Sequence, residues 1–342
     1  MKSVQSRNAS MSDVARHAGV ALGTVSNALN HPDKVAPATM GRIRAAIDEL
    51  GFVRNNQARS LATGQSHSLG MVVTDLANSF FVDIARGAEE GAQLESMTLL
   101  LANSDNTLQK EETYLDLFDQ ARFAGIVLAP FEASTDGLDR VRSHGRPVVL
   151  VNVAADVRDG CSVVVDNEHG GYVAARHLID QGRRRIAFVG GPDRLEPLLE
   201  RRLGVERAIR EEGGRVELEE FIVPAVNSPD GRKVGLEIVG RAAADRPDGV
   251  VAASDLLAMG MIHAFSGVID VPREISLIGY DDNTAARESS LPISTIAQPG
   301  YELGLAAAGL LCDEIFRADE HTHRVVRLEP HLIVRQSSNL QR

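Results

Sequence analysis

Apolar residues recur at helical spacing along the first 50 residues of the chain. Val14 and Ala18 lie four residues apart, and after a short gap Val25 and Leu29 repeat that spacing. Residues four apart lie on one face of a helix, so the pattern predicts two short helices, the second over 22–30. The second helix also carries short polar side chains, which are expected to point away from its apolar face.

Capping residues mark the ends of these helices. Ser10 and Asp13 have the spacing of a capping box, and Gly19 supplies the positive φ that ends a helix at a sharp turn. A third helix is predicted between Pro37 and Gly51, because proline is favoured in the first turn and glycine after the last. Its apolar face is formed by Ile43, Ile47 and Leu50. The three helices predict a helix-turn-helix unit, in which small residues at Ala15 and Gly23 let the first two helices cross closely.

Twelve short apolar runs separated by helical stretches follow from Leu69 onward. They are LGMVV, LLLA, GIVLA, PVVLV, SVVV, RIAFVG, FIV, GVVAA, SLIG, STI, VVRL and HLIV. Continuous apolar runs are typical of strands buried on both faces of a parallel sheet built from βαβ units. A first group ends at Val151 and a second begins at Ser162. The fold class is therefore α/β, with two doubly wound parallel sheets and a ligand crevice at the carboxyl ends of the strands.

The charge is divided unevenly along the 342 residues. The whole chain carries a net charge of −11, whereas residues 1–65 carry +4 and the rest −15. A basic head on an acidic body is the asymmetry expected when one end meets phosphates. No run approaches the ~18 consecutive apolar residues of a membrane helix. Lys2 and Arg7 are followed by no apolar segment, which predicts no secretory signal and a cytoplasmic protein.

Sequence signatures of enzymes and cofactor sites do not follow the strands. A dinucleotide G-x-G-x-x-G, a phosphate-binding G-x-x-x-x-G-K-[ST] and a G-x-S-x-G nucleophile turn are all missing. We therefore expect a binding protein without a cofactor rather than an enzyme.

Metal-ligating residue types occur at two places. Cys161 and Cys312 are far apart and are expected to be buried free thiols, not disulfide or zinc cysteines. His321-x-His323 beside Glu320 has a spacing that a metal could use, but a polar surface loop before the next strand is the favoured interpretation, with no metal site.

The N-terminal segment resembles the lactose-repressor family of bacterial regulators (LacI/GalR type). The resemblance is carried by SDVARHAGVALGTVSNALN and VAPATMGRIRAAIDELGFVRNNQARSLATG. It implies that Leu22, Gly23 and Asn27 read bases from a recognition helix. It also implies that Asn55–Thr63 is a hinge helix, with Leu61 wedged between base pairs in the minor groove. The full predicted DNA-binding set is Ser10, Leu22, Gly23, Thr24, Ser26, Asn27, Asn30, Asn55, Arg59, Leu61 and Ala62.

Asn27 departs from the arginine that many members of the family carry. An amide prefers adenine N6 and N7, whereas arginine prefers guanine O6 and N7, so the operator is expected to differ.

The resemblance also implies the fold of the periplasmic binding proteins, whose chain crosses between the two lobes three times. The predicted crossings lie near Ser162, Ser294 and Val325. The predicted segments are a disordered tail (1–9), the headpiece (10–54), a hinge helix and linker (55–66) and an effector-binding and dimerisation domain (67–342). Within that domain, lobe 1 spans about 67–161 and 296–324, and lobe 2 about 162–294 and 325–342.

The candidates for effector contacts lie where strands end and loops enter the crevice. Asp75, Asn78 and Phe80 follow the first strand, Asn152, Asp255 and Gln298 follow later strands, and Arg201 opens a helix. The resemblance implies that Asn152, Arg201, Asp255 and Gln298 stand at effector-pocket positions. Carboxylate, amide and guanidinium groups suit vicinal hydroxyls, which favours a sugar or sugar derivative; a purine is the alternative effector. Without tryptophan, the stacking surface falls to Phe80, Phe131, Phe265 or Tyr280.

These features predict an allosterically controlled transcription regulator, most simply a repressor. The expected partners are double-stranded DNA with a pseudo-palindromic operator, a small polar effector and a second copy of the chain, with no membrane. Two alternatives are a small-molecule-binding protein without a DNA role and a βαβ enzyme with an added helical arm.

Overall fold

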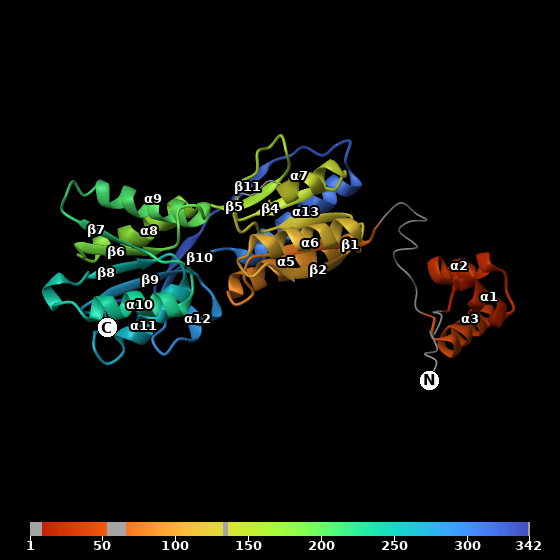
Figure 1. The fold of residues 1–342 in the computed structure, drawn as a ribbon, viewed down its shortest axis with the longest axis horizontal. Helices are drawn as coiled ribbons and strands as arrows, with labels where there is room; N and C mark the ends of the chain where they lie inside the picture. The colour runs from red at the N-terminus through yellow and green to blue at the C-terminus, as the bar shows by residue number, and fades with distance from the viewer. Residues whose placement is uncertain (1–8, 53–65, 133–135, 341–342) are drawn as a thin grey trace. The chain divides into compact units, whose positions relative to one another are not determined.

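The computed structural model describes residues 9–52, 66–132 and 136–340, which form two compact units, Met1–Gln65 and Ser66–Arg342 (Figure 1). Each unit has its own hydrophobic core. The division falls within the segment predicted as hinge and linker. Along the described residues, no helix combines the length and the apolar character needed to cross a bilayer.

The first unit is the predicted bundle of three helices. They are α1 (Met11–Ala18), α2 (Leu22–Asn30) and α3 (Pro37–Leu50), with a 3₁₀ turn η1 (Pro32–Lys34) between the last two. Val14, Val25 and Ile43 are each at most 1% exposed and meet at the centre. The capping box is present, because Asp13 N–H donates to Ser10 Oγ while the Asp13 carboxylate accepts from the Ser10 backbone N–H. Gly19 ends α1 at a φ of +63°, as predicted.

The second unit consists of two lobes, each a six-stranded sheet between two layers of helices (Figure 1). In the first lobe the strand order is β11-β5-β4-β3-β1-β2. Helices α5 and α13 cover one face of this sheet, and α6 and α7 cover the other. The bounds are β1 (Ser68–Val73), β2 (Thr98–Asn103), β3 (Gly125–Leu128), β4 (Val148–Val151), β5 (Ser162–Val165), β11 (Val325–Leu328), α5 (Ser79–Leu94), α6 (Leu108–Gln120), α7 (Asp136–Ser143) and α13 (Gly300–Phe316).

The second lobe repeats this architecture with the order β12-β10-β9-β8-β6-β7. Helices α8 and α9 cover one face, and α10 and α11 the other. The bounds are β6 (Arg185–Gly190), β7 (Glu217–Ile222), β8 (Gly249–Ala252), β9 (Ser276–Asp281), β10 (Ser294–Ala297), β12 (His331–Ile333), α8 (Asn167–Asp180), α9 (Glu196–Arg210), α10 (Ser228–Val239), η2 (Ala243–Asp245), α11 (Asp255–Phe265) and α12 (Thr284–Glu288). The α/β prediction is confirmed, and all twelve apolar runs are strands, although β12 pairs antiparallel to β10.

Strand β7 extends further toward the N-terminus than its apolar run. The run FIV predicts a strand from Phe221, whereas the structure begins β7 at Glu217. The strand lies at the edge of its sheet, so its side chains need not be buried on both faces, and glutamates are tolerated.

The three crossings between the lobes each come one strand later than predicted. Strands β5 and β11 pair with each other in the first sheet, and β10 pairs with β9 in the second. The predicted positions at Ser162, Ser294 and Val325 are the starts of these strands. The crossings therefore follow Val165, Ala297 and Leu328. The prediction was wrong here because apolar composition marks a strand without specifying the sheet in which it finds its partner.

Reciprocal glycines bring helices into backbone contact at three places. A Cβ on Gly171 of α8 would overlap the carbonyl oxygen of Arg201 in α9, and a Cβ on Gly204 of α9 would overlap the carbonyl oxygen of Glu168. Similar pairs join α5 to α13 and α10 to α11. The equivalent glycines are Gly87, Gly304, Gly231 and Gly260.

Replacing Gly204 with alanine is expected to lower the free energy of unfolding by about 1 to 3 kcal/mol, because the added methyl group meets rigid backbone. Urea denaturation measures the change. Gly309 of α13 provides the control, since a Cβ there meets no atom within 4 Å, and Gly309→Ala should leave stability unchanged or raise it by up to ~1 kcal/mol. Equal stability of the Gly204→Ala protein and the wild type would contradict the close contact between α8 and α9.

Candidate DNA-reading helix and ligand cavity

Helix α2 presents one polar face that the bundle does not cover. Val25 and Ala28 are buried against the other helices, which turns Leu22, Gly23 and Asn27 outward. Leu22 is 48% exposed, an unusual position for a large apolar side chain. Of the other predicted residues on α2, Thr24 and Ser26 are half-buried, and Asn30 is exposed and donates to Ser26 Oγ over 3.3 Å.

The small size of Gly23 is not what lets α1 and α2 cross closely, contrary to the prediction from the sequence. A Cβ at this position would have no atom within 4 Å, so the small residue is not needed for packing within the first unit. Ser10 is occupied as the cap of α1, its hydroxyl lying 2.6 Å from Asp13 Oδ2. The predicted hinge contacts Asn55, Arg59, Leu61 and Ala62 lie outside the described residues.

The second unit contains a cavity of about 640 Å³ between its lobes. The cavity is lined by loops that follow β1, β2, β3 and β4 in one lobe and β6, β7 and β8 in the other, together with the end of β9. This is the predicted location at the carboxyl ends of the strands. Its volume lies in the usual range for small-molecule sites, roughly 300 to 1,000 Å³. Of the predicted effector residues, five line it: Asp75, Asn78, Phe80, Asn152 and Arg201.

Arg201 is the buried cation of the cavity. It lies on α9 at 4% exposure, and its guanidinium donates to Asn167 Oδ1 over 2.9 Å and to the carbonyl of Ala253 over 2.6 Å. The guanidinium also lies 3.7 Å from Asp281 Oδ1 and 3.7 Å from the centre of the Tyr280 ring. These contacts hold the planar guanidinium group against the second lobe.

Asp281 is the anion of the cavity, and the sequence did not single it out. It ends β9 at a φ of +113°, and its carboxylate accepts from Gln298 Nε2 over 2.7 Å and from Ser254 Oγ over 3.1 Å. Asn78 Nδ2, from the other lobe, donates to it over 2.8 Å. Burial raises the pKa of the Asp281 carboxyl, and the guanidinium of Arg201 and these hydrogen bonds oppose the rise.

Asn78 therefore has two roles, which could not be told apart from its position in the loop after β1. Its Oδ1 caps α5 by accepting from Phe80 N–H over 3.1 Å, while its Nδ2 reaches Asp281. A second bridge between the lobes joins Thr284 N–H to Ser79 Oγ over 3.0 Å. The two lobes are thus hydrogen-bonded to each other at the cavity.

Asn152 is an acceptor in the cavity wall that lacks a partner. It follows β4 at a φ of +67°, and its buried Oδ1 has no hydrogen-bond partner among the described residues. A buried unpaired acceptor is costly, which makes it a natural partner for a donor on a ligand.

Asp255 and Gln298 were predicted to contact the ligand but lie behind the cavity wall. Asp255 is fully buried at the start of α11, where it accepts from Thr295 Oγ1 over 2.8 Å and from Asn283 N–H over 2.9 Å. Ser254, not Asp255, caps α11. Gln298 acts on the cavity only through its bond to Asp281. Both residues follow strands, but a residue at a strand end can point into the sheet as readily as into the crevice.

Asp255 predicts a pH-dependent stability. Burial, followed by the charge of Asp281, raises the pKa of the Asp255 carboxyl well above its ordinary value. The folded protein therefore keeps the proton on Asp255 to a higher pH than the unfolded chain does. The protonated carboxyl thus favours the folded state at low pH, and this stabilisation is lost as the pH rises through the folded pKa. Asp255→Asn is isosteric and carries no charge, and its melting temperature is expected to exceed that of the wild type increasingly as the pH rises toward neutrality.

Thermal melts of both proteins between pH 4 and pH 8 measure this difference. Gly309→Ala, which removes no titratable group, is the control and should give a curve parallel to that of the wild type. A constant difference between Asp255→Asn and wild type at every pH would refute the raised pKa.

Aromatic rings in the cavity come from the first lobe. Phe80, Phe81 and Phe131 line it, and the rings of Phe80 and Phe81 meet edge to face with centres 5.3 Å apart. Tyr280 and Phe265, also considered as stacking surfaces, are at most 1% exposed within the core of the second lobe. Of the four rings considered from the sequence, Phe80 and Phe131 line the cavity, and Tyr280 and Phe265 do not.

The two-histidine segment is a surface loop before β11, as the sequence predicted, with Glu320, Thr322 and Arg324 exposed, but the His321 side chain turns inward. His321 has a side chain only 2% exposed, and the carboxylate beside the two imidazoles is that of Glu314, not Glu320. Cys161 and Cys312 are buried free thiols, as predicted.

Comparison with known proteins agrees with both the three-helix unit and the two-lobed unit. Residues 10–55 match the family described as "Bacterial regulatory proteins, lacI family", and residues 175–338 match a periplasmic binding protein-like domain. The chain is 32% identical to the HTH-type transcriptional repressor PurR of Photobacterium profundum over 96% of its own length and 98% of the relative's.

Solved structures of regulators are also similar to this chain over nearly its whole length. The regulator CelR in complex with cellobiose matches with a TM-score of 0.70 at 28% identity, covering 97% of this chain and 100% of that one. The Lac repressor dimer bound to operator and the anti-inducer ONPF matches in fold with a TM-score of 0.81 at 21% identity, covering 97% and 99%.

Proposed function

The chain belongs to the lacI family of bacterial regulatory proteins, and from this premise we propose that it is a cytoplasmic repressor controlled by a neutral sugar. It is a DNA-binding transcription regulator. In the proposal two copies bind a pseudo-palindromic operator through the outward face of α2 and the hinge segment 55–66. The cavity of the second unit serves as a sensor and not as a catalytic site.

The charge balance of the cavity favours a neutral ligand over a phosphorylated one. Among the described lining residues, five carboxylates face two guanidiniums. The carboxylates belong to Asp75, Asp105, Glu132, Glu196 and Asp281, and the guanidiniums to Arg194 and Arg201. Arg194 is already paired with Glu132 at 2.6 Å, so little positive charge remains for a phosphate.

The chemistry of the lining favours a polyhydroxyl ligand over a purine. The single observation that carries this proposal is the set of acceptors that line the cavity: Asn152 Oδ1, which has no partner among the described residues, and the Asp281 carboxylate beside the buried Arg201. A sugar ring offers a hydroxyl donor at most carbons, whereas a purine presents few N–H groups. Phe131 adds an apolar ring face against which a pyranose or furanose can lie.

A thermal-shift screen of the full chain tests the effector class. Neutral pentoses, hexoses and disaccharides, their phosphate esters and free nucleobases are compared at equal concentration, and a neutral sugar is expected to raise the melting temperature most. A shift confined to phosphate esters or to nucleobases would overturn the sugar proposal while leaving the regulator class intact.

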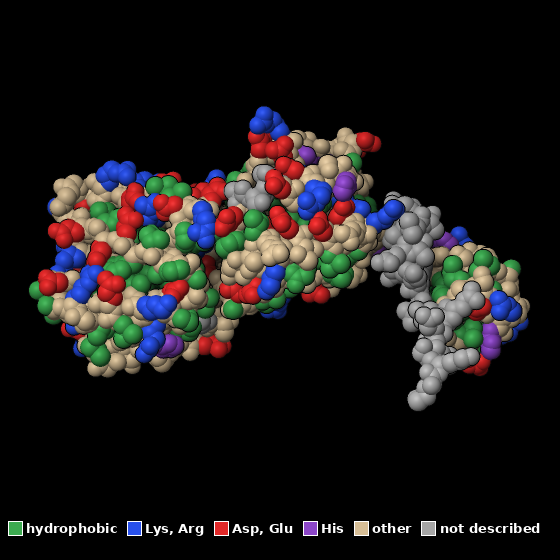
Figure 2. All heavy atoms as spheres, viewed as in Figure 1, with side chains coloured by type: hydrophobic (Ala, Val, Ile, Leu, Met, Phe, Trp, Pro, Cys, Tyr) green, Lys and Arg blue, Asp and Glu red, His purple; other side chains and the backbone are tan. Residues whose placement is uncertain are grey.

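Operator binding is tested separately by fluorescence anisotropy on DNA selected from a random pool. The logarithm of the affinity should fall linearly with the logarithm of salt concentration, at a slope of about −0.9 per neutralised phosphate. On the face drawn in Figure 2, Asp and Glu side chains are spread over both lobes of the second unit, interspersed with Lys and Arg. Removal of residues 1–65 should therefore abolish the salt-dependent binding, and binding retained by the second unit alone would contradict the assignment.

A further inference from the structure

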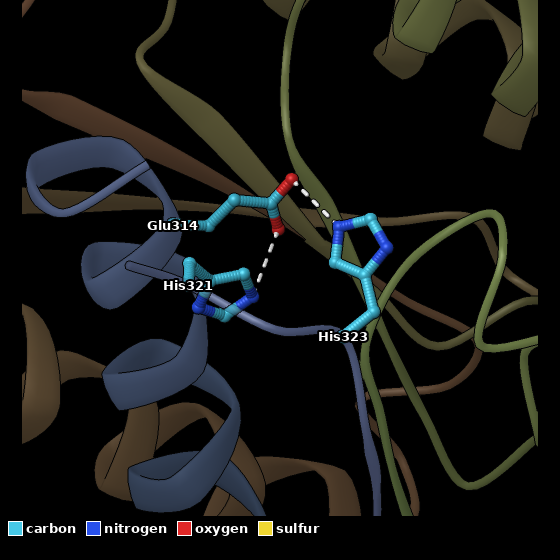
Figure 3. Close-up of side chains that lie close together, drawn as sticks. All are labelled: Glu314, His321 and His323. Atoms are coloured by element: carbon cyan, nitrogen blue, oxygen red, sulfur yellow. Dashed lines mark hydrogen bonds and ion pairs between the residues drawn. The ribbon is translucent and has the colours of Figure 1, made fainter. Parts of the chain in front are cut away.

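The connection between α13 and β11 brings three metal-ligating side chains together. Glu314 lies in the last turn of α13, and His321 and His323 lie in the loop that leads to β11. One ligand atom from each residue lies within 4.8 Å of those of the other two. Figure 3 shows the Glu314 carboxylate between the two imidazole rings, with one oxygen directed at each.

The separations of these atoms match those around a bound metal ion. Glu314 Oε1 lies 3.3 Å from His323 Nε2, and Glu314 Oε2 lies 3.8 Å from His321 Nε2. Ligand atoms bonded to tetrahedral zinc at about 2.0 to 2.2 Å stand roughly 3.3 to 3.6 Å from one another. Each imidazole contacts a different carboxylate oxygen, so the side chains must rotate for the three groups to share one ion.

Cys161 lies beside one member of the cluster, His321, but outside the group of ligand atoms that are within 4.8 Å of one another. Its Sγ lies 3.3 Å from His321 Nε2, and the backbone N–H of Arg324 donates to the same sulfur over 3.4 Å. Cys161 immediately precedes β5, and Arg324 immediately precedes β11. The sulfur is thus held where the edge pair of strands begins.

The carboxylate of Asp313 orients the central imidazole. Asp313 Oδ2 lies 2.8 Å from His321 Nδ1, and in the neutral ring this contact favours the tautomer with the proton on Nδ1 and the lone pair on Nε2, which faces Glu314 and Cys161. A carboxylate behind a histidine ligand is the usual outer contact of zinc histidines. Arg317 also pairs with Asp313, at 2.5 Å, and so holds the carboxylate in place.

The Glu314 carboxylate does not form all the hydrogen bonds that its two oxygens could accept. Its Oε2 is buried and has no hydrogen-bond partner among the described residues. Arg142 places a positive charge near Glu314, yet its own Nε and Nη2 are also buried without hydrogen-bond partners. A buried carboxylate oxygen without a hydrogen bond, facing the His321 imidazole, is suited to contact a cation.

We propose that Glu314, His321 and His323 form a binding site for Zn²⁺ or a similar divalent transition ion, with Cys161, next to His321, moving onto the ion as the fourth donor. The donor set of two imidazoles, a carboxylate and a thiolate suits zinc. The site lies at the amino-terminal edge of the first sheet, at the end of the strands opposite the ligand cavity. A bound ion ties the end of α13 and the edge strand β11 to the start of β5.

Metal binding by the tag-free full chain tests the proposal. Isothermal titration with Zn²⁺ is expected to show one site per chain, and Co²⁺ is expected to give the visible bands of tetrahedral coordination with a thiolate charge-transfer band. Glu314→Gln and His323→Gln should each weaken Zn²⁺ binding by about tenfold or more. Asp313→Asn, which removes only the outer contact, should weaken it by roughly 10- to 100-fold.

The controls separate this site from adventitious binding by surface histidines. His144 also pairs with a carboxylate, that of Asp119 at 2.6 Å, but lies outside the cluster, so His144→Gln should bind Zn²⁺ like the wild type.

Equal Zn²⁺ affinity in the His323→Gln, Glu314→Gln and wild-type proteins would overturn the site. A Co²⁺ spectrum unchanged by Cys161→Ser would overturn the assignment of the sulfur. Circular dichroism and melting without metal identify any variant that has simply failed to fold, and His323, at 30% side-chain exposure, is the substitution least disturbing to the core.

Discussion

Replacing Arg201 with alanine is expected to reduce the affinity for the effector by about 30-fold to several thousand-fold. The range corresponds to the 2 to 5 kcal/mol typical for removing one partner of a buried, hydrogen-bonded charge pair. In the wild type the guanidinium lies 3.7 Å from Asp281 and is almost completely buried. Its loss leaves the Asp281 carboxylate without its cation at the place where the ligand is proposed to bind.

The adjacent arginine provides a matched control for this substitution. Arg202 lies on the same helix but pairs with Asp193, Glu206 and Glu220, none of which reaches Asp281. Arg202→Ala should keep the effector affinity within a few-fold of the wild type. Calorimetric titration with the sugar found by screening measures both variants, and Arg201→Lys shows whether charge alone restores part of the affinity.

Loss of affinity must be distinguished from loss of fold. The Arg201→Ala protein is expected to melt several degrees below the wild type, because a buried charge is left unpaired. It should still bind operator DNA, since the DNA-binding unit has a separate core. A variant that binds the operator and retains wild-type effector affinity would place the ligand away from Arg201.

The sequence predicted the strands and the position of the cavity because both follow from local patterns. Runs such as RIAFVG are buried on both faces and therefore read as strands wherever they pair. The carboxyl ends of parallel strands must meet at one edge, so Asp75 and Asn152 were predicted from their positions after strands, and the resemblance also implied Asn152. Asp281 was missed because the strand continues two residues past the apolar run SLIG. The pair Asp281–Asp282 after that run was the available signal.

What the sequence could not provide is the direction in which strand-end side chains point. Asp255 begins α11 and Asp281 ends β9, so both flank βα connections of the second lobe, yet one faces Thr295 within the protein and the other faces Arg201 in the cavity. The choice depends on contacts across the fold, such as the bond from Asn78 of the opposite lobe to Asp281. Likewise, Glu314 joins His321 and His323 because a helix end and a loop are folded together, and not because of sequence spacing.

The bridge between the lobes suggests how the proposed effector acts at a distance. Asn78 and Gln298 both hold the Asp281 carboxylate, and Gln298 lies at one of the three crossings. A ligand hydroxyl that binds Asp281 competes with these two amides and shifts the balance between lobe arrangements. Such a shift can control DNA binding only to the extent that the ligand prefers one arrangement over the other.

Asn27→Ala is expected to weaken binding to a selected operator by about 30-fold to more than 10⁴-fold. A bidentate contact between an amide and adenine contributes roughly 1 to 3 kcal/mol, and a symmetric dimer would lose this contact in both half-sites. The side chain is exposed on the outward face of α2, whose buried side is formed by Val25 and Ala28, so the substitution should not disturb the three-helix core. Affinity for unrelated DNA should change little, because that binding depends on phosphate contacts.

A double-mutant cycle with modified DNA identifies the contact itself. Replacing each adenine of a half-site with 7-deazaadenine removes the N7 acceptor, and the adenine read by Asn27 is the one whose replacement costs affinity in the wild type but not in Asn27→Ala. Gly23→Ala provides a contrast on the same face, since a methyl group there has space within the protein and should leave or slightly raise its melting temperature. Additive losses at every adenine would show that Asn27 reads no base. In that event the outward face of α2 would position the protein on phosphates, and the specificity would have to come from the hinge segment.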